Sequence, residues 1–297
     1  MSELILSVIG IIGVMLLGML CWRWFDQREE QAVWTRLAAL QPDEPARFDP
    51  AMLQTLPAPA QRYLRYAIAP GTPLFSVAEV TMQGTFRLGS SDQPGDMTLQ
   101  AEQVLAAPYG FLWRMSAAAG LMRVSGSDMA EGRMSWSHFW LQQVIPVARV
   151  GGDADHRRSA FGRCVAEAVF WTPAVLLTSE NVEWEAVDES LVRVIFRFEG
   201  LEQAVDLFVE PDGHLAKIVF QRWSDANPQK RYQLQPFGGH LSRYRNFHGF
   251  NLPTRIEAGN FFGTDQYFEF FKVDVTDVRF PDAADNNPDG DPQQKPR

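Results

Sequence analysis

The sequence is poor in cysteine, which limits how covalent bonds can hold its fold together. It has two cysteines in 297 residues, Cys21 and Cys164. The first lies in an apolar N-terminal run and the second in a central apolar segment. We therefore expect the two thiols to stay apart, with no structural disulfide, which leaves the redox environment of the protein undecided.

The sequence also lacks a positive charge excess and familiar catalytic motifs. Its formal net charge is −9, which excludes the basic surface typical of nucleic-acid-binding proteins. The five histidines include no pair at i, i+4 spacing, and there is no Cys-x-x-Cys, Gly-x-Ser-x-Gly, phosphate-binding loop or dinucleotide fingerprint. We therefore predict no catalytic residues, no metal site and no cofactor.

The N-terminus holds the one long hydrophobic run. Leu4–Trp24 carries a single charge, Arg23, and is long enough to cross a bilayer core of about 30 Å. It lacks the basic start and the small-x-small cleavage site of a signal peptide. We predict an uncleaved transmembrane helix over residues 1–25 of a single-pass bacterial inner-membrane protein. Its end carries a possible interfacial aromatic belt, Trp22, Trp24 and Phe25.

The side of the membrane on which the rest of the chain lies is harder to predict. Arg23, Arg28 and Arg36 follow the apolar run, whereas no Lys or Arg precedes it. The positive-inside rule then favours the cytoplasm for the large domain.

Residues 26–55 are predicted to form a juxtamembrane helix and a Pro-rich linker. Val33, Leu37 and Leu40 follow helical spacing, which favours a helix packed on the domain over one lying at the lipid interface. Five prolines between Gln41 and Pro59 indicate extended chain. A short helix is expected over Pro59–Ala67, with a buried side formed by Tyr63, Leu64 and Ile68.

Residues 56–281 are predicted to form one curved sheet-and-helix domain of about twelve strands. Apolar and polar residues alternate between short turns, as neighbouring antiparallel strands require. The acidic, Pro-rich segment 282–297 is predicted to be a disordered tail. The expected strands begin near Leu74, followed by Thr98–Ala106, Phe111–Ala117, Leu121–Ser127, Arg133–Phe139, Val182–Ala186, Val192–Phe198, Ala204–Val209, Leu215–Arg222, Tyr232–Pro236, His240–Phe247, Leu252–Ala258 and Gln266–Val275.

A helical segment, Ala160–Leu177, separates the two groups of strands. It is apolar most of the way round, which is typical of a buried helix, and Pro173 should end or kink it. Asp153 or Asp155 is expected to cap its start. We predict an α+β fold, mostly antiparallel β: a strongly curved, partly closed barrel of meanders wrapped around this helix. A β-sandwich with a surface helix is the alternative.

The candidate ligand-binding residues are the polar pair of the central helix and the aromatic residues expected on the inner face of the sheet. Arg163 and Glu167 stand at i, i+4, so they can pair on one helix face. They can be a buried structural pair, a surface pair or a ligand-facing pair. For the aromatic side chains, including Phe139 and Trp184, core packing is the competing explanation. The predicted ligand-binding set is Phe111, Trp113, Trp136, Trp140, Arg163, Glu167, Phe170 and Trp171.

Several motifs resemble those of an uncharacterised bacterial membrane-anchored domain family. The opening Leu56–Tyr66, reading LPAPAQRYLRY, is similar to the family's LPxPxxRYLxY motif. The residues Arg163, Glu167, Trp171 and Pro173 resemble its Arg…Glu…Trp…Pro helix, although Cys164 stands where an aromatic residue is expected. The resemblance covers about Leu56 to Phe280 and implies no established activity. The order of elements also resembles the unclosed barrels that carry lipids or lipid-modified proteins across the bacterial periplasm, which would favour a periplasmic domain.

Three functions are compatible with these features. The favoured one is a membrane-anchored, non-catalytic module that holds a lipid or acyl chain between a bent sheet and a helix. The alternative is a structural or assembly factor that binds another membrane protein through an exposed apolar patch. The third is a hydrolase with an unrecognised site, for which a pocket with converging histidine and carboxylate groups would be needed.

Overall fold

All of the described strands belong to one antiparallel sheet. The computed structural model describes residues 2–89 and 94–281, and in this part of the chain thirteen strands pair in the order β6-β5-β4-β3-β2-β1-β13-β12-β11-β10-β9-β8-β7. The strands are β1 (Ala78–Gly89), β2 (Pro94–Ala106), β3 (Gly110–Ala119), β4 (Met122–Glu131), β5 (Met134–Leu141), β6 (Ile145–Gly151), β7 (Val182–Ala186), β8 (Leu191–Phe198), β9 (Leu201–Val209), β10 (Leu215–Ser224), β11 (Gln233–Phe247), β12 (Phe250–Asn260) and β13 (Phe268–Arg279).

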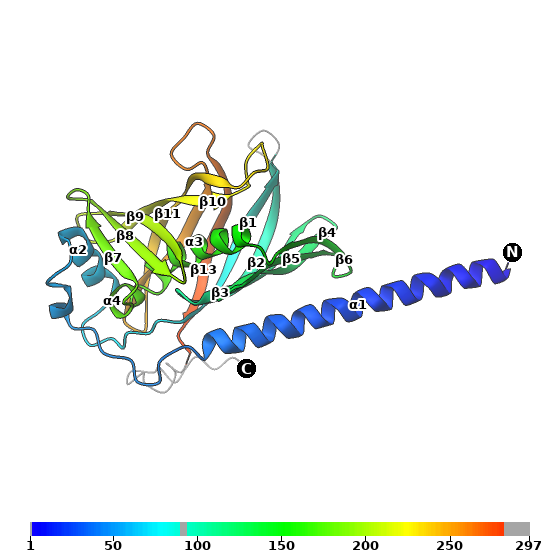
Figure 1. The fold of residues 1–297 in the computed structure, drawn as a ribbon, viewed down its shortest axis with the longest axis horizontal. Coiled ribbons are helices and arrows are strands. Elements are labelled where there is room, and N and C mark those ends of the chain that lie inside the picture. Colours follow the sequence, from blue (N-terminus) through cyan, green and yellow to red (C-terminus); the bar gives the residue numbers. More distant parts are fainter. Residues whose placement is uncertain (1, 90–93, 282–297) are drawn as a thin grey trace.

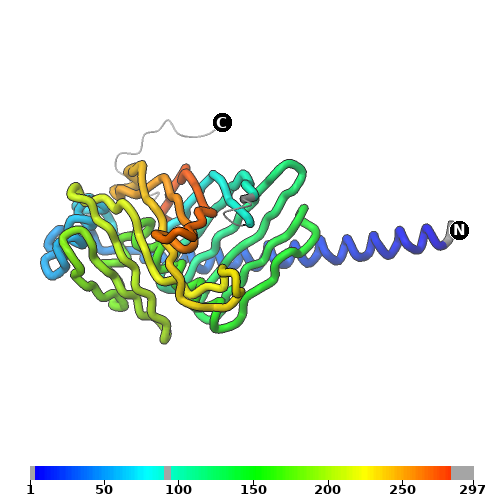
Figure 2. The backbone as a smooth tube through the Cα atoms, turned by 90° about the horizontal axis from the view of Figure 1, so that it is seen from above, coloured from blue at the N-terminus to red at the C-terminus, as the bar shows by residue number. Residues whose placement is uncertain are grey.

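Two meanders meet at the middle of this sheet. Strands β1–β6 form one and β7–β13 the other, and β1 pairs with β13 between them, with Val80 opposite Val278. Figure 2 shows the two meanders as separate blocks that meet at the cyan and orange-red strands. Gly84 lies in this junction, where a Cβ atom would come within 2.1 Å of the carbonyl oxygen of Lys272. The ends β6 and β7 stay apart, so the sheet curls without closing, as predicted.

The central helix lies on the concave face of the sheet. It is α3 (Ala154–Trp171), which contacts strands of both meanders (Figure 1). Asp153 is its N-cap, because the carboxylate accepts from the backbone N–H of His156 at 2.7 Å. Pro173 follows the end of α3, and a short helix, α4 (Val175–Thr178), comes next. The buried-helix prediction is confirmed, and the β-sandwich alternative is wrong because the described strands form a single sheet.

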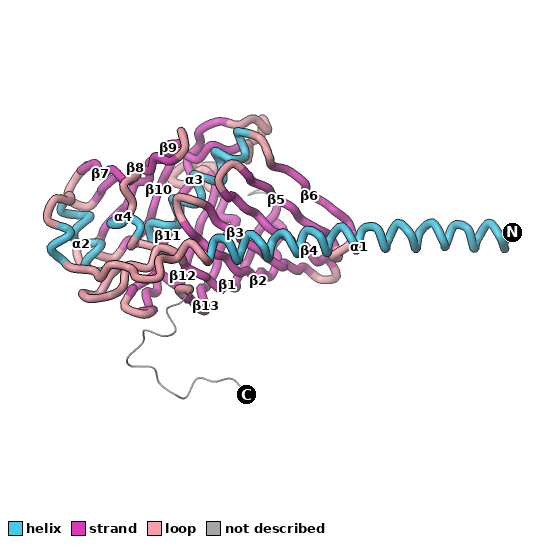
Figure 3. The backbone as a smooth tube through the Cα atoms, turned by 60° about the horizontal axis from the view of Figure 1, so that its bottom comes forward, coloured by secondary structure: helices cyan, strands magenta, loops and turns pink. Residues whose placement is uncertain are grey.

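The N-terminal helix covers the opposite face of the first meander. Helix α1 (Ser2–Ala38) is continuous, and its C-terminal half lies along the sheet while its N-terminal half projects beyond it (Figure 3). Val33 and Leu37 are fully buried against the sheet, together with Val104 and Met129. Side chains 4–18 are exposed, and α1 is long and apolar enough to cross a membrane.

A short helical layer closes one end of the domain. It consists of η1 (Pro50–Leu53) and α2 (Ala58–Ala67). The expected inner side of α2 is buried, since Tyr63, Leu64 and Ile68 are at most 1% exposed. The Tyr63 hydroxyl donates to the backbone carbonyl of Val169, which ties this layer to α3.

Two strand predictions differ from the structure. Strand β6 (Ile145–Gly151) is missing from the prediction, because its apolar side chains are half exposed at the sheet edge and Pro146 interrupts the pattern. Strand β11 is one strand and not two, since Gly238 and Gly239 continue its pairing with β10 and β12. The predicted acidic tail, residues 282–297, lies outside the described residues.

Candidate functional site

A cavity of about 250 Å³ lies between α3 and the concave face of the sheet. Its walls come from both meanders, so the curl of the sheet and not any single strand creates it. The lining is mostly aromatic and aliphatic, which is typical of sites for apolar molecules. The lining residues are Phe86, Trp113, Asp128, Ser137, Phe139, Arg163, Ala166, Glu167, Phe170, Trp171, Ile218, Phe220, Arg222, Phe237, Gly238, Gly239, Leu241, Ile256, Ala258, Phe270 and Phe271.

The apolar wall is a continuous series of ring contacts across the strands. Phe86 on β1 packs edge-on against Phe270 on β13, with ring centroids 5.8 Å apart. Phe270 in turn contacts Phe237 on β11 at 6.0 Å, and Phe237 contacts Phe220 on β10 at 5.3 Å. Such offset and edge-to-face pairs stabilise the wall beyond simple burial. The second meander therefore contributes a largely apolar surface to the cavity.

The opposite wall carries a partly buried ion cluster centred on Arg163. Its guanidinium lies 2.6 Å from Asp128 and 2.8 Å from Glu167, and it donates to the side chain of Gln103 at 3.1 Å. Burial alone would lower the pKa of Arg163, but the two carboxylates outweigh it and hold the pKa above its usual value. The side chains of Arg163 and Glu167 are 16% and 19% exposed, so the surface-pair interpretation is wrong.

A chain of hydrogen bonds extends this cluster to His156. The Ser137 hydroxyl lies 2.8 Å from Asp128 and 3.1 Å from Nε2 of His156, while Nδ1 of His156 lies 2.8 Å from the hydroxyl of Ser135. The Ser137 hydroxyl donates to the Asp128 carboxylate, so its oxygen is left to accept a hydrogen bond from Nε2–H of His156. This is the reverse of the proton path by which a histidine base activates a serine nucleophile. The chain is therefore a structural network that holds the start of α3 to β4 and β5.

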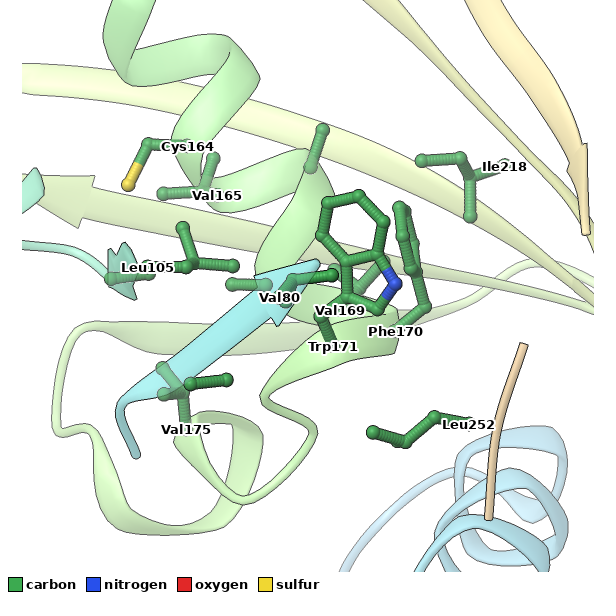
Figure 4. Close-up of a cluster of buried hydrophobic side chains, with 14 of the residues drawn as sticks. Val80, Leu105, Cys164, Val165, Val169, Phe170, Trp171, Val175, Ile218 and Leu252 are labelled. Carbon is green, nitrogen blue, oxygen red and sulfur yellow. The ribbon is translucent and has the colours of Figure 1, made fainter. Parts of the chain in front are cut away.

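Three hydrogen-bond donors at the cavity have no acceptor among the described residues. They are Nε of Arg222 and the indole nitrogens of Trp113 and Trp171. The two tryptophans are 4% and 1% exposed, so their side chains are shielded from bulk solvent. In Figure 4, Trp171 lies beside Phe170 with its nitrogen on the side away from Leu105. The cavity thus combines apolar walls with unused donors.

Arg222 differs from Arg163 in its lack of a carboxylate partner within the described chain. Its guanidinium lies 5.1 Å above the ring of Phe237. Burial, and then the positive charge of Arg163, lower the pKa of Arg222 from its ordinary value. An additional negative charge nearby would therefore stabilise this side chain.

Comparison with protein families assigns most of the chain to one family. Residues 46–273 match the model of a family of unknown function, DUF6544. The chain belongs to this family. The match spans both meanders and α3, so the cavity lies inside the family domain, whereas α1 precedes it. The comparison with curated proteins gives no match.

Solved structures give weak similarities. A LolA superfamily protein from Nitrosomonas europaea is 12% identical, with a TM-score of 0.41, and the match covers 77% of this chain and 94% of that one. A DUF1329 family protein from Desulfovibrio piger is 12% identical, with a TM-score of 0.35, covering 76% and 94%. At these TM-scores neither similarity supports an inference about ligand or activity.

The structure divides the residues selected from the sequence into two groups. Five of the eight line the cavity, together with Phe139, and Phe111 lies directly beneath the guanidinium of Arg163 at 4.7 Å. Trp136 and Trp140 lie on the opposite face, so the inner-face expectation is wrong for them. On β5 side chains alternate, and Ser137 and Phe139 take the concave side. Trp184 on β7 packs at the margin of the core. The five cavity residues are Trp113, Arg163, Glu167, Phe170 and Trp171.

The sequence analysis did not select Arg222, Asp128 or Ser137. Each lies on a strand with alternating polarity, which is the signal that could have placed it on the same face as its apolar neighbours. Arg222 is two residues from Phe220 and four from Ile218, and all three line the cavity. An arginine at an inward position of an otherwise apolar strand face is a useful indication of a site.

Proposed function

We propose that this protein is a membrane-attached binding module that holds an apolar molecule, such as a lipid or acyl chain, between α3 and the curved sheet. The observation that carries the proposal is the aromatic-lined cavity at this junction. A space of about 250 Å³ with mostly aromatic and aliphatic walls has the lining expected of a site for an apolar molecule. The assembly-factor alternative is less well supported, because it predicts a domain without an internal cavity.

The membrane attachment in this proposal rests on α1. Its apolar residues before Trp22 are exposed in the structure, and burying them in a bilayer would remove them from water. We propose that residues 1–25 cross the bacterial inner membrane, that 26–55 connect them to the binding domain, and that 56–281 form that domain. Labelling of a cysteine at exposed Glu189, in a Cys21→Ser background, would decide on which side of the membrane the domain lies.

Filling the cavity provides the test. Ala166 on α3 lines it, and Ala166→Phe would occupy its volume; Ala154→Phe places the same ring on an exposed turn of the same helix. Full-length protein extracted in native nanodiscs should carry an additional lipid in the wild type and in Ala154→Phe, but not in Ala166→Phe. The lipids extracted with each variant are quantified by mass spectrometry. The lipid content of Ala166→Phe gives the background of surrounding bilayer lipid, and the excess in the wild type is the lipid held in the cavity.

Ile218→Phe provides a second filling variant if Ala166→Phe proves unstable. Equal lipid content in the wild type and both filling variants would show that the cavity is not a binding site. A wild-type protein that carries no additional lipid and takes up no added amphiphile would have the same meaning.

A further inference from the structure

The unused donors of the cavity specify the chemistry of one end of its ligand. Described cavity-lining residues supply three unpaired groups, and all three are donors: Arg222 Nε, Trp113 Nε1 and Trp171 Nε1. A buried donor left without an acceptor costs about 1–3 kcal/mol, so a ligand that brings an acceptor to any of the three would gain stability from that contact. A plain hydrocarbon would leave every one of them unpaired.

The unpaired positive charge of Arg222 favours an anionic acceptor over a neutral one. The two cavity carboxylates, Asp128 and Glu167, both bind Arg163, and their remaining oxygens accept from Ser137 and Gln103. Arg222 is the charged lining residue with no ion pair to any described residue. A guanidinium binds carboxylate and phosphate oxygens more strongly than neutral acceptors.

We propose that the ligand is an acidic amphiphile, whose anionic oxygen head pairs with Arg222 and whose hydrocarbon chain contacts the phenylalanine wall. This inference rests on the proposed function and adds the charge of the ligand to it. Arg222 lies two residues from Phe220 on the same strand face, so one molecule can contact both. A fatty acid and a phosphate-bearing lipid fragment share this chemistry.

Head-group variation tests the charge. Full-length protein in nanodiscs is titrated with radiolabelled dodecanoic acid, dodecyl phosphate and dodecan-1-ol, and binding to Ala166→Phe nanodiscs is subtracted as the blank. The wild type should bind one of the acidic probes about tenfold to a hundredfold more tightly than the alcohol. Which acid binds more tightly distinguishes a carboxylate from a phosphate ligand.

Arg222 variants test the residue. Arg222→Met keeps the unbranched apolar stem and should remove the preference for acid while leaving alcohol binding unchanged; Arg222→Lys keeps the charge and should retain much of the preference. Equal binding of acid and alcohol by the wild type, or a preference that survives in Arg222→Met, would overturn this inference and leave the binding function intact. No binding above the blank for any probe would instead overturn the proposed function.

A separate set of exposed apolar residues surrounds the place where α1 leaves the sheet. The β3–β4 and β5–β6 turns are joined there, since Gln142 donates to the backbone carbonyl of Leu121 at 2.5 Å. Gln143 accepts from Arg23 of α1 at 3.4 Å, so the turns lie beside the end of the apolar run. Leu121 is 93% exposed. We call these two turns the hairpin tips; their other exposed apolar side chains are Met122, Ile145 and Val147.

We infer that the hairpin tips insert into the lipid interface next to α1. The inference assumes that α1 crosses the bilayer as proposed above, and it does not depend on the cavity. Trp22 packs on Trp140 at 5.5 Å, which fixes the sheet relative to the helix where an aromatic belt would meet the membrane surface. A helix and two rigidly joined turns would hold the domain in one orientation on the membrane, as a single flexible tether would not.

Depth-dependent quenching tests this contact. A Leu121→Cys variant in a Cys21→Ser background is labelled with a polarity-sensitive fluorophore and reconstituted in nanodiscs containing nitroxide lipids. We expect strong quenching and a blue-shifted emission, whereas Val187→Cys, exposed on the β7–β8 connection, should show neither. Emission at position 121 identical to that at 187 would overturn the inference. A blue shift without quenching would also overturn it, because a protein and not lipid would then cover the tips.

Discussion

Each face of the sheet packs against a long helix, but the two faces differ in whether the indole N–H groups of their tryptophans have hydrogen-bond acceptors. On the α1 face, the indoles of Trp34, Trp136 and Trp140 donate to Glu79, Ser127 and Asp26 at 2.7, 3.0 and 2.8 Å. On the α3 face, Trp113 and Trp171 find no described acceptor. Trp136 and Trp140 are as buried as Trp113 and Trp171, at 7% and 0% exposed against 4% and 1%, so exposure does not explain the difference.

The charges show the same contrast. On the α1 face, Arg23 pairs with Glu30 at 3.1 Å and Arg149 pairs with Asp26. On the α3 face, Arg163 is paired and Arg222 is not. One hydroxyl on the α1 face, Ser125, also lacks a described partner, but its indoles and buried charges are satisfied.

This difference is the one that the proposed function predicts between an internal docking surface and a ligand-binding surface. Where a protein surface meets only itself, unpaired buried donors are selected against, because each lowers the stability by about 1–3 kcal/mol. Where a ligand supplies the acceptor, the same donors are satisfied only in the complex. Under the proposed function, the α1 face is a completed contact and the α3 face is completed by the ligand.

The two cavity arginines offer the largest test of this contrast. Arg163→Met should lower the free energy of unfolding by about 3 kcal/mol, because it leaves Asp128 and Glu167 buried without their counter-charge. Arg222→Met should lower it by less than about 1 kcal/mol, since no carboxylate loses a partner. Urea unfolding of the full-length variants in detergent micelles measures both. Similar losses would show that the two arginines are equally embedded in the fold.

A matched pair of tryptophans gives the next largest effect. Trp140→Phe and Trp171→Phe remove the same ring area from sites that are 0% and 1% exposed. Only the first removes a hydrogen bond to a buried carboxylate, that of Asp26, which keeps its bonds from Arg149, so it should be the more destabilising by about 1–3 kcal/mol. Trp113→Phe should resemble Trp171→Phe. If all three lose the same stability, the indole hydrogen bonds do not distinguish the faces.

Alternation and apolar periodicity were enough to predict the curved sheet and its buried helix. Each expected strand segment falls on an observed strand because period-two patterns depend on local residues. The edge strand β6 was missed because Ile145, Val147 and Val150 are half exposed and Pro146 is tolerated only at an edge. Pairing at an edge depends on a neighbour and not on a buried side, so its own pattern is weak.

The site was predicted in part, and the missing part has a physical cause. Alternation separates Phe139 from Trp136 and Trp140 on β5, but it does not tell which face α3 will take, since α1 makes the other face apolar too. Arg163 and Glu167 were found from helical spacing alone. Arg222 was not, because alternation groups it with Phe220 and Ile218 but does not tell that the curl of the sheet brings this face of β10 next to α3.

The smallest effect concerns pH and the α1 face. Burial, and then the positive charge of Arg149, lower the pKa of His138 to about 4, although Asp26 acts in the opposite direction. An unfolded histidine titrates near 6.5, so between pH 6.5 and 4 the unfolded chain binds a proton that the folded chain does not. The free energy of unfolding should therefore fall as the pH drops through this window. Above pH 6.5 the histidine is neutral in both states, so His138 adds no pH dependence to the stability there.

Replacing the histidine isolates this contribution. His138→Gln should reduce the slope of stability against pH between 6.5 and 4, while the exposed His248→Gln provides a control for loss of a histidine. The slope is measured by urea unfolding at several pH values. Because His138 stacks on Trp136 at 5.3 Å and pairs in register with Arg149, a reduced slope would show that acid loosens the completed α1 face. An unchanged slope would place the pH sensitivity in other groups, and the contrast between the faces would then rest on the tryptophans and arginines alone.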